Sequence, residues 1–213
     1  MKNIIRRQFK YQNSGFVYWL IGINVLIFAV MELAGREVSH FIVTRMAMIP
    51  LAVRHGWVWT FITYMFLHGG IRHILFNMLG LFIFGSHVER QFGSREFLLY
   101  YLLTGMLAGI FSFVVYYMTG NYFIALMGAS GALYAIMLAY AVLYPDSYIY
   151  IWGIIPLRAP VMVLGFTAIE LFFSLSGGRG NVAHLTHLAG FGFGWLYIMI
   201  RFGVNPLRRL LRR

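Results

Sequence analysis

The chain has 213 residues, of which 61% are hydrophobic and only 11% are charged. Soluble domains carry about 25% charged residues, so this composition excludes an ordinary water-soluble protein. The absence of cysteine excludes thiol catalysis and a disulfide framework. The formal net charge of +11 comes from Lys and Arg beside the ends of apolar segments, where they attract anionic lipid headgroups. It therefore does not indicate a nucleic-acid partner.

Several apolar segments approach the roughly 20 residues needed to cross the hydrocarbon of a bilayer. We expect transmembrane helices near residues 16–34, 66–86, 96–118, 128–144, 160–176 and 185–202. The predicted fold is thus an all-α membrane protein, a six-helix bundle over residues 16–203. A basic segment, 1–15, precedes the bundle and a basic tail, 204–213, follows it.

Lys and Arg predict the orientation of this bundle. More of them fall on the cytoplasmic side if both termini are cytoplasmic, and positive charge is concentrated there in membrane proteins. We therefore expect a multi-pass protein of the cell membrane with cytoplasmic termini. Residues 35–65 are apolar and contain Trp57 and Trp59, which predicts a loop in the outer membrane interface. Residues 145–159 are expected to be an irregular cytoplasmic connection.

Ser130 lies at the outer end of the fourth predicted helix, in the run Gly128-Ala129-Ser130-Gly131. Glycines on both sides allow a tight turn and close approach of another backbone, which would present the hydroxyl to a substrate. The same tetrapeptide can also be a packing seam whose serine bonds to its own helix.

His187 opens the sixth predicted helix from the outer side, so its depth matches that of Ser130. A neutral imidazole can take the serine proton and return it to a leaving amine. Gly190 and Gly194 follow on one helix face and favour close packing against another helix. His184, one turn earlier, is a second candidate for the base, and helical spacing alone does not choose between the two histidines.

His73 and Asn77 share one face of the second predicted helix because they are four residues apart. Both are suited to donate hydrogen bonds to a developing oxyanion, although they can also form a buried interhelical pair. His68, His73 and His187 could in principle hold zinc. Asn77 is a poor zinc ligand and no His-Glu-x-x-His pattern occurs, so we predict no metal and no other cofactor.

No carboxylate stands where a partner of His187 is expected. Asp146 falls on the cytoplasmic side, and Glu170 lies within the fifth predicted helix, where a protonated acid or a pair with a polar neighbour is expected. We therefore predict a Ser-His dyad and keep a triad with Glu170 as the alternative. In a dyad, Tyr134 is placed to pack against the imidazole.

Four motifs, in order, resemble the rhomboid intramembrane serine proteases: His73-x-x-x-Asn77, Glu89-Arg90 with Gly93, Gly128-x-Ser130-Gly131-x-x-Tyr134, and the run His184 to Gly190. The resemblance implies the six-helix rhomboid core with Ser130 as nucleophile and His187 as base. It also implies an oxyanion hole of His73, Asn77 and the Ser130 backbone N–H, with Tyr134 stacked on His187. The family commonly has Trp-Arg in the first loop, where this chain has Trp59-Thr60.

The sequence thus predicts an intramembrane serine endopeptidase. Its partners would be transmembrane protein substrates and the bilayer, with the active site open to the extracytoplasmic side. Two other classes remain open: a catalytically inactive rhomboid-like adaptor that binds client helices, and a transporter that uses the histidines as a proton relay. The oligomeric state and the natural substrate are not predicted.

Overall fold

The computed structural model describes residues 9–151, 153–175 and 181–211. Six of the basic residues that count toward the predicted orientation lie outside these ranges: Lys2, Arg6, Arg7, Arg179, Arg212 and Arg213. The main helices are α1 (Phe16–Leu33), α5 (Ile71–Gly80), α6 (Ser86–Phe92), α7 (Ser94–Met118), α8 (Ser130–Leu143), α9 (Ala159–Leu175) and α10 (Asn181–Tyr197). The other helices are α2 (Arg36–Met46), α3 (Pro50–Arg54), α4 (Thr60–Thr63) and α11 (Pro206–Leu210). Strand β1 (Tyr148–Ile151) pairs with β2 (Ile155–Arg158).

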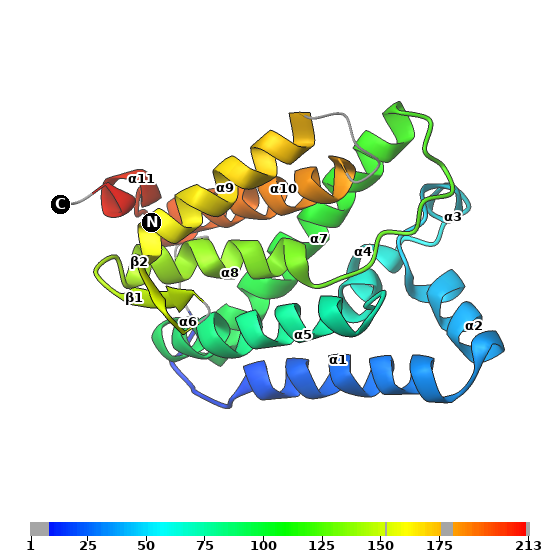
Figure 1. The fold of residues 1–213 in the computed structure, drawn as a ribbon, viewed down its shortest axis with the longest axis horizontal. Helices are drawn as coiled ribbons and strands as arrows, with labels where there is room; N and C mark the ends of the chain where they lie inside the picture. Colours follow the sequence, from blue (N-terminus) through cyan, green and yellow to red (C-terminus); the bar gives the residue numbers. More distant parts are fainter. Residues whose placement is uncertain (1–8, 152, 176–180, 212–213) are drawn as a thin grey trace.

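Helix α8 lies in the middle of the bundle, with α5, α7, α9 and α10 packed around it (Figure 1). Every residue from Gly131 to Val142 is buried except the half-buried Tyr134. A helix that is apolar on all sides is stable only when it is covered on all sides. The 14 residues of α8, too few to span a bilayer alone, therefore fit a helix surrounded by protein.

Among the residues that the structure describes, three helical segments are long and apolar enough to cross a membrane: Phe16–Leu33, Ile71–Phe92 and Ser94–Met118. Helices α8 and α9 are apolar but shorter. Large side chains such as Trp19, Leu26 and Phe172 are exposed on the bundle surface, as expected for groups that face lipid rather than water. A bundle of several membrane helices is therefore present, while the number of spans stays a prediction.

The second membrane segment differs from its predicted range. Residues 64–66 form a 3-10 turn, and α5 begins only at Ile71, after the helix-breaking pair Gly69-Gly70. A π-helical segment, Leu81–Gly85, joins α5 to α6, so the helical run continues to Phe92 and ends at Gly93, whose φ is +80°. The predicted range 66–86 was therefore wrong at both ends. Glycines mark where the helical run begins and ends, and the prediction had followed hydropathy instead.

Glu89 holds the start of α1 against the end of α6. Its carboxylate accepts hydrogen bonds from the backbone N–H groups of Phe16 (2.7 Å) and Val17 (2.9 Å), and a further one from the Ser94 hydroxyl. The first N–H groups of a helix have no partner within it, and a carboxylate there also complements the helix dipole. The Glu89-Arg90 motif thus has a structural role at this end of the bundle.

The connection 35–65 is folded rather than loop-like. It contains α2, α3 and α4, and the Arg45 guanidinium lies 4.8 Å from the centroid of the Trp57 ring, which stacks on Trp59. Thr60, where the family commonly has arginine, is buried and donates from its hydroxyl to the Trp57 carbonyl (2.6 Å). The cation that lies over Trp57 therefore comes from α2.

The prediction of an irregular connection at 145–159 was wrong. Strands β1 and β2 form an antiparallel hairpin in which Tyr148 pairs with Arg158 and Ile151 with Ile155. Aromatic and β-branched residues alternate along β1, and such residues favour strands. The all-α assignment therefore fails at this hairpin, which lies with α11 at the end of the bundle opposite to α2 and α3 (Figure 1).

Gly190 permits very close packing of α10 on α8. A Cβ atom added to Gly190 would lie 2.0 Å from the Gly131 carbonyl oxygen, and one added to Gly194 would lie 2.9 Å from the Ala135 Cβ. The obstacle at Gly190 is backbone, which cannot rotate away. The two helix axes can therefore approach this closely only if residue 190 has no side chain.

We expect Gly190→Ala to lower the free energy of unfolding by an amount at or above the upper end of the roughly 1–3 kcal/mol typical of overpacked cores. Gly192→Ala is the matched control, since an added Cβ there meets nothing within 4 Å. Thermal unfolding in detergent micelles would measure both. Equal unfolding temperatures for the two variants would contradict this packing.

Candidate active site

Ser130 is the first residue of α8, and its side chain is half-buried. The preceding Gly128 has φ +123°, a region that residues with a Cβ rarely adopt. This turn ends the strand-like segment in which Leu126 pairs with Met48 and starts the helix at Ser130. The backbone N–H of Ser130 has no acceptor within α8, because the first N–H groups of a helix never do.

His187 on α10 faces Ser130 directly. Its Nε2 atom lies 2.8 Å from the Ser130 Oγ atom, a hydrogen-bond distance. One turn farther along α10, Gly190 sits against Gly131, so the close helix contact and the Ser-His contact have the same origin. The structure thus brings together the two residues that the sequence predicts as nucleophile and base.

Tyr134 lies one turn after Ser130 and stacks on the His187 ring. The ring centroids are 4.4 Å apart with an angle of 10° between the planes. Phe191 also packs edge-on against Tyr134, with ring centroids 4.9 Å apart. Rotation of the imidazole about its bond to Cβ is therefore restricted by a flat neighbour.

His73 lies beside the Gly128 turn. A Cβ added to Gly128 would be 2.6 Å from the His73 Nε2 atom and 3.8 Å from the Ser130 Oγ atom, so the ring faces the serine across the space that this glycine leaves. The Gly69 N–H donates to His73 Nδ1 (3.4 Å). Nδ1 then acts as the acceptor, which leaves Nε2 as the N–H donor of a neutral ring.

Asn77 is buried one turn farther along α5. Its side-chain nitrogen donates to the His73 carbonyl (2.8 Å), so one amide hydrogen is engaged and the second remains for another acceptor. The buried His68 ring meets His73 edge-on, with centroids 4.9 Å apart. The contact with His68 thus restricts the orientation of the His73 ring.

Glu170 is the residue whose position the sequence did not predict. Its side chain is 7% exposed, and one carboxylate oxygen, Oε1, lies 3.0 Å from His187 Nδ1. The other oxygen lies 2.5 Å from His184 Nδ1, and the Tyr134 hydroxyl donates to Oε1. The expectation that no carboxylate stands against His187 was therefore wrong. An ionisable residue inside an apolar helix was the available signal.

Glu170, His184 and His187 also form a set of metal-ligand types, with donor atoms within 4.8 Å of one another. It differs from the set His68, His73 and His187 considered from the sequence. Zinc accepts such ligands. The two Nδ1 atoms nevertheless already stand at hydrogen-bond distance from separate oxygens of the Glu170 carboxylate. Hydrogen bonds alone therefore satisfy these two nitrogens and both carboxylate oxygens.

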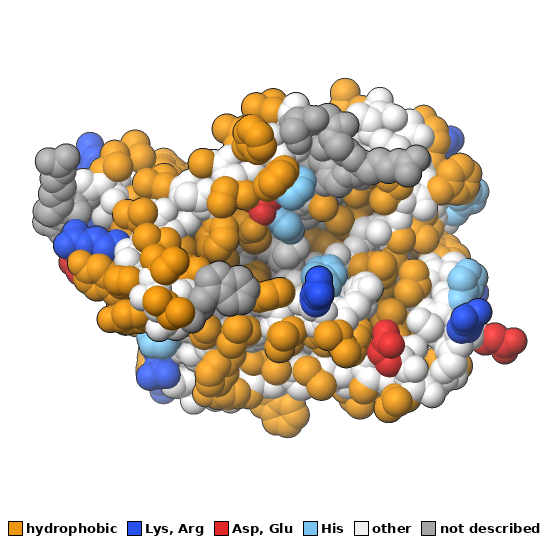
Figure 2. Space-filling view, in the orientation of Figure 1, with side chains coloured by type: hydrophobic (Ala, Val, Ile, Leu, Met, Phe, Trp, Pro, Cys, Tyr) orange, Lys and Arg blue, Asp and Glu red, His pale blue; other side chains and the backbone are white. Residues whose placement is uncertain are grey.

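The bundle is hollowed near these residues. In the space-filling view, histidine and acidic side chains gather around a hollow between α5 and α9, with apolar side chains over most of the surrounding face (Figure 2). Because the side chains of Ser130, His73 and His187 are half-buried rather than enclosed, this polar group is open to molecules from outside the bundle.

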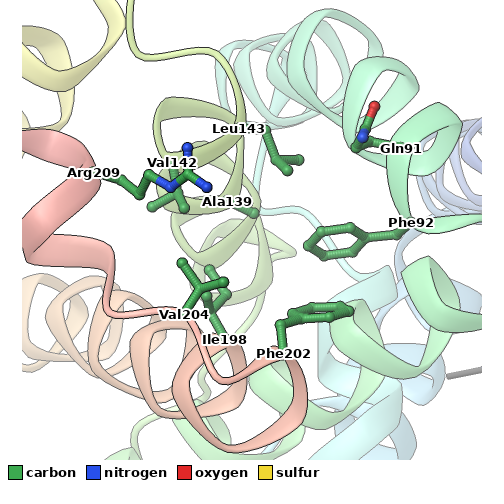
Figure 3. Close-up of a pocket in the computed structure, with 9 residues that line it drawn as sticks. All are labelled: Gln91, Phe92, Ala139, Val142, Leu143, Ile198, Phe202, Val204 and Arg209. Atoms are coloured by element: carbon green, nitrogen blue, oxygen red, sulfur yellow. The ribbon is translucent and has the colours of Figure 1, made fainter. Parts of the chain in front are cut away.

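A separate cavity of about 470 Å³ lies toward the hairpin end, between α6, α8 and the chain after α10 (Figure 3). The Phe92 and Phe202 rings, 4.7 Å apart, line one side, and Arg209 reaches over from α11. None of the predicted site residues lines this cavity. The cavity is therefore separate from the group of side chains around Ser130.

The family model of the rhomboid domain matches residues 55–204, which include all of the residues described around Ser130. The chain belongs to the rhomboid family. It is therefore an integral membrane protein, in agreement with its apolar helices.

Several curated relatives resemble it. It is 31% identical over 208 residues to "RHOMBOID-like protein 12, mitochondrial" of Arabidopsis thaliana, covering 84% of this chain and 60% of that protein. It is 35% identical over 126 residues to rhomboid protease GluP of Bacillus subtilis, covering 58% and 25% of the two chains. Rhomboid protease GlpG of Haemophilus influenzae is 32% identical over 151 residues, covering 70% and 74%. The chain thus spans less than two thirds of the length of the first two of these relatives.

We expect Gly128→Ala to slow the reaction of Ser130 with a fluorophosphonate by about 100-fold or more, because the new Cβ would displace the His73 ring. Gly120→Ala is the control: its φ is also positive, at +75°, but an added Cβ meets nothing within 4 Å. Labelling rates on folded protein would measure the effect. Unchanged labelling of Gly128→Ala would mean that His73 need not lie beside the serine.

Proposed function

We propose that this protein is an intramembrane serine endopeptidase that hydrolyses peptide bonds in or beside transmembrane segments of other proteins. Ser130 is the nucleophile and His187 the general base. The observation that carries the proposal is the 2.8 Å distance between Ser130 Oγ and His187 Nε2 inside an apolar helix bundle. Polar groups at membrane depth are costly and usually functional.

In the proposed reaction, His187 Nε2 takes the hydroxyl proton as Ser130 Oγ attacks the carbonyl carbon of the substrate. The imidazolium then gives this proton to the leaving amine, and the carbon–nitrogen bond breaks to leave an acyl-serine. Water, deprotonated by the same nitrogen, attacks the ester carbon. His187 then gives the water proton to Ser130 Oγ as the ester bond breaks, which releases the acid product and regenerates the serine hydroxyl and the neutral imidazole.

The oxyanion of the tetrahedral intermediate would be stabilised by His73 Nε2–H, the Ser130 backbone N–H and the second amide hydrogen of Asn77. Their support is the contact of His73 with the Gly128 turn and the helix-start position of Ser130. Donors fixed in advance by α5 and α8 need no reorganisation when the charge develops. Loss of one such donor typically costs about 100-fold or more in rate.

The substrate enters from the bilayer in this proposal. Extended backbone is tolerated at membrane depth only where it faces protein or water, so a substrate helix must unwind locally to place a peptide bond beside Ser130. The hollow between α5 and α9 (Figure 2) offers a polar place for such a strand. Small and helix-breaking residues near the cleaved bond are the expected preference.

The proposal also includes the orientation of the enzyme in the membrane. We propose a six-helix core with cytoplasmic termini and an active site open to the extracytoplasmic side of the cell membrane. Arg208 and Arg209 on α11 would meet anionic lipid headgroups. An inactive adaptor would bind client helices without needing the contact between Ser130 and His187, so this contact favours the enzyme.

We expect Ser130→Ala to abolish cleavage of a model transmembrane substrate in proteoliposomes, with a loss of roughly a thousandfold or more. Its thermal unfolding should stay near that of the wild type, because only a small hydroxyl is lost from an open site. Gel analysis of the products over time would measure this. A variant that retains activity within tenfold would show that Ser130 is not the nucleophile.

The two histidines of α10 should differ in the same assay. We expect His187→Ala to be as inactive as Ser130→Ala, because base and nucleophile act as a unit and their losses do not add. His184→Ala should retain substantial activity, since Ser130 Oγ stands against His187, while the His184 ring lies at Oε2 of Glu170 and on Phe173. The opposite ranking would transfer the role of the base to His184.

A further inference from the structure

We infer that Glu170 is a positioning residue for His187, so that Ser130, His187 and Glu170 act as a triad rather than a dyad. This inference rests on the proposed function and adds to it the group that orients the base. The role is carried by the placement of the Glu170 carboxylate on the edge of the imidazole opposite to Ser130.

The two contacts of His187 determine which nitrogen carries the proton. An ionised carboxylate only accepts hydrogen bonds, so Nδ1, 3.0 Å from Glu170 Oε1, must carry a hydrogen. The neutral ring then has its lone pair on Nε2, 2.8 Å from Ser130 Oγ. Glu170 therefore holds the tautomer that can accept the serine proton, as the acid of a serine-protease triad does.

The carboxylate itself is held in place by its other partners. Tyr134 from α8 donates its hydroxyl to Oε1, and His184 from α10 lies 2.5 Å from Oε2. A buried charge is costly unless it is hydrogen-bonded, and these groups supply such bonds to both oxygens. Tyr134 serves twice, because its ring also stacks on His187. The ring and the carboxylate are thus aligned by one side chain.

Glu170 would also stabilise the positive charge that develops on His187 during the reaction. When His187 takes the serine proton it becomes a cation at a site whose surroundings are mostly apolar. Electrostatic interactions are stronger there than in water, so a carboxylate at Nδ1 stabilises the imidazolium and with it the transition state. Without that carboxylate, proton transfer to His187 would leave a cation with no adjacent anion among its described contacts.

A purely structural role for Glu170 is the competing explanation, because the same contacts tie α9 to α8 and α10. The two roles predict different results. If Glu170 only joins the helices, its loss lowers the free energy of unfolding and impairs substrate binding and turnover together. An orienting carboxylate affects the turnover number, while substrate binding and the unfolding temperature change little.

The test compares Glu170→Gln with the wild type in proteoliposomes that contain a model transmembrane substrate. We expect kcat to fall by about 10²–10⁴-fold, with KM within about threefold and an unfolding temperature near that of the wild type. Glu170→Asp should recover part of the lost kcat, since it restores the charge. Glu32→Gln, which neutralises an exposed carboxylate at the end of α1, is the control for the change of charge and should behave as the wild type.

A spectroscopic measurement adds a readout whose first part needs no Glu170 variant. In Ser130→Ala protein labelled with ¹⁵N-histidine, we expect His187 to carry its hydrogen on Nδ1, with that proton shifted downfield by the carboxylate. The downfield signal should be absent from the double variant Ser130→Ala/Glu170→Gln. A His187 ring protonated only on Nε2 would overturn the inference even if no Glu170 variant folds.

The outcomes separate the inference from the proposed function. If Ser130→Ala still cleaves the substrate, the proposed function fails. If Ser130→Ala is inactive but Glu170→Gln stays within tenfold of the wild type, the function stands and the triad is wrong. A loss of kcat in Glu170→Gln that only follows a lowered unfolding temperature overturns the triad in favour of the structural tie. Activity lost with a chelator and restored by zinc would assign Glu170, His184 and His187 to a metal and would also overturn it.

Discussion

The close approach of α10 to α8 at Gly190 is the constraint on which the site depends. Gly190 leaves no room for a Cβ atom against the Gly131 carbonyl, and these glycines lie beside the two residues of the predicted chemistry. Ser130 precedes Gly131, and His187 lies one turn before Gly190. A change in helix separation would therefore act directly on the 2.8 Å distance between Oγ and Nε2. The packing of α10 on α8 therefore also determines the distance between the Ser130 hydroxyl and the His187 ring.

Buried carboxylates show how charge is accommodated within the bundle. Glu89 accepts from backbone N–H groups at the start of α1, and Glu96 bonds to Tyr197 and to the Arg201 guanidinium at 2.6 and 2.8 Å. Those two join helices through groups suited to stable contacts. Glu170, like Glu96, accepts from a tyrosine hydroxyl, but its other two partners are histidines, which can take up and release protons. The type of partner, rather than burial alone, distinguishes the carboxylate at the site from the structural ones.

Much of the site could be predicted from the sequence because its signals are local. The glycines around Ser130, the spacing of His187 from Gly190 and the pair His73 and Asn77 each lie within one helix or one turn. Glu170 was visible as an ionisable residue in an apolar segment, but its partner could not be predicted, because the rotation of α9 relative to α10 depends on tertiary packing. The hairpin at 148–158 was missed for a related reason: short strands outside the bundle carry little hydropathy signal.

The central claim is that Ser130 is a nucleophile activated by His187 within the membrane bundle. It is tested most directly by treating the folded protein with a fluorophosphonate and identifying the modified residue by peptide mass spectrometry. The account predicts one adduct on Ser130 in the wild type, and no adduct in the His187→Ala protein under the same conditions. An unmodified Ser130 in the wild type, or equal modification without His187, would contradict it.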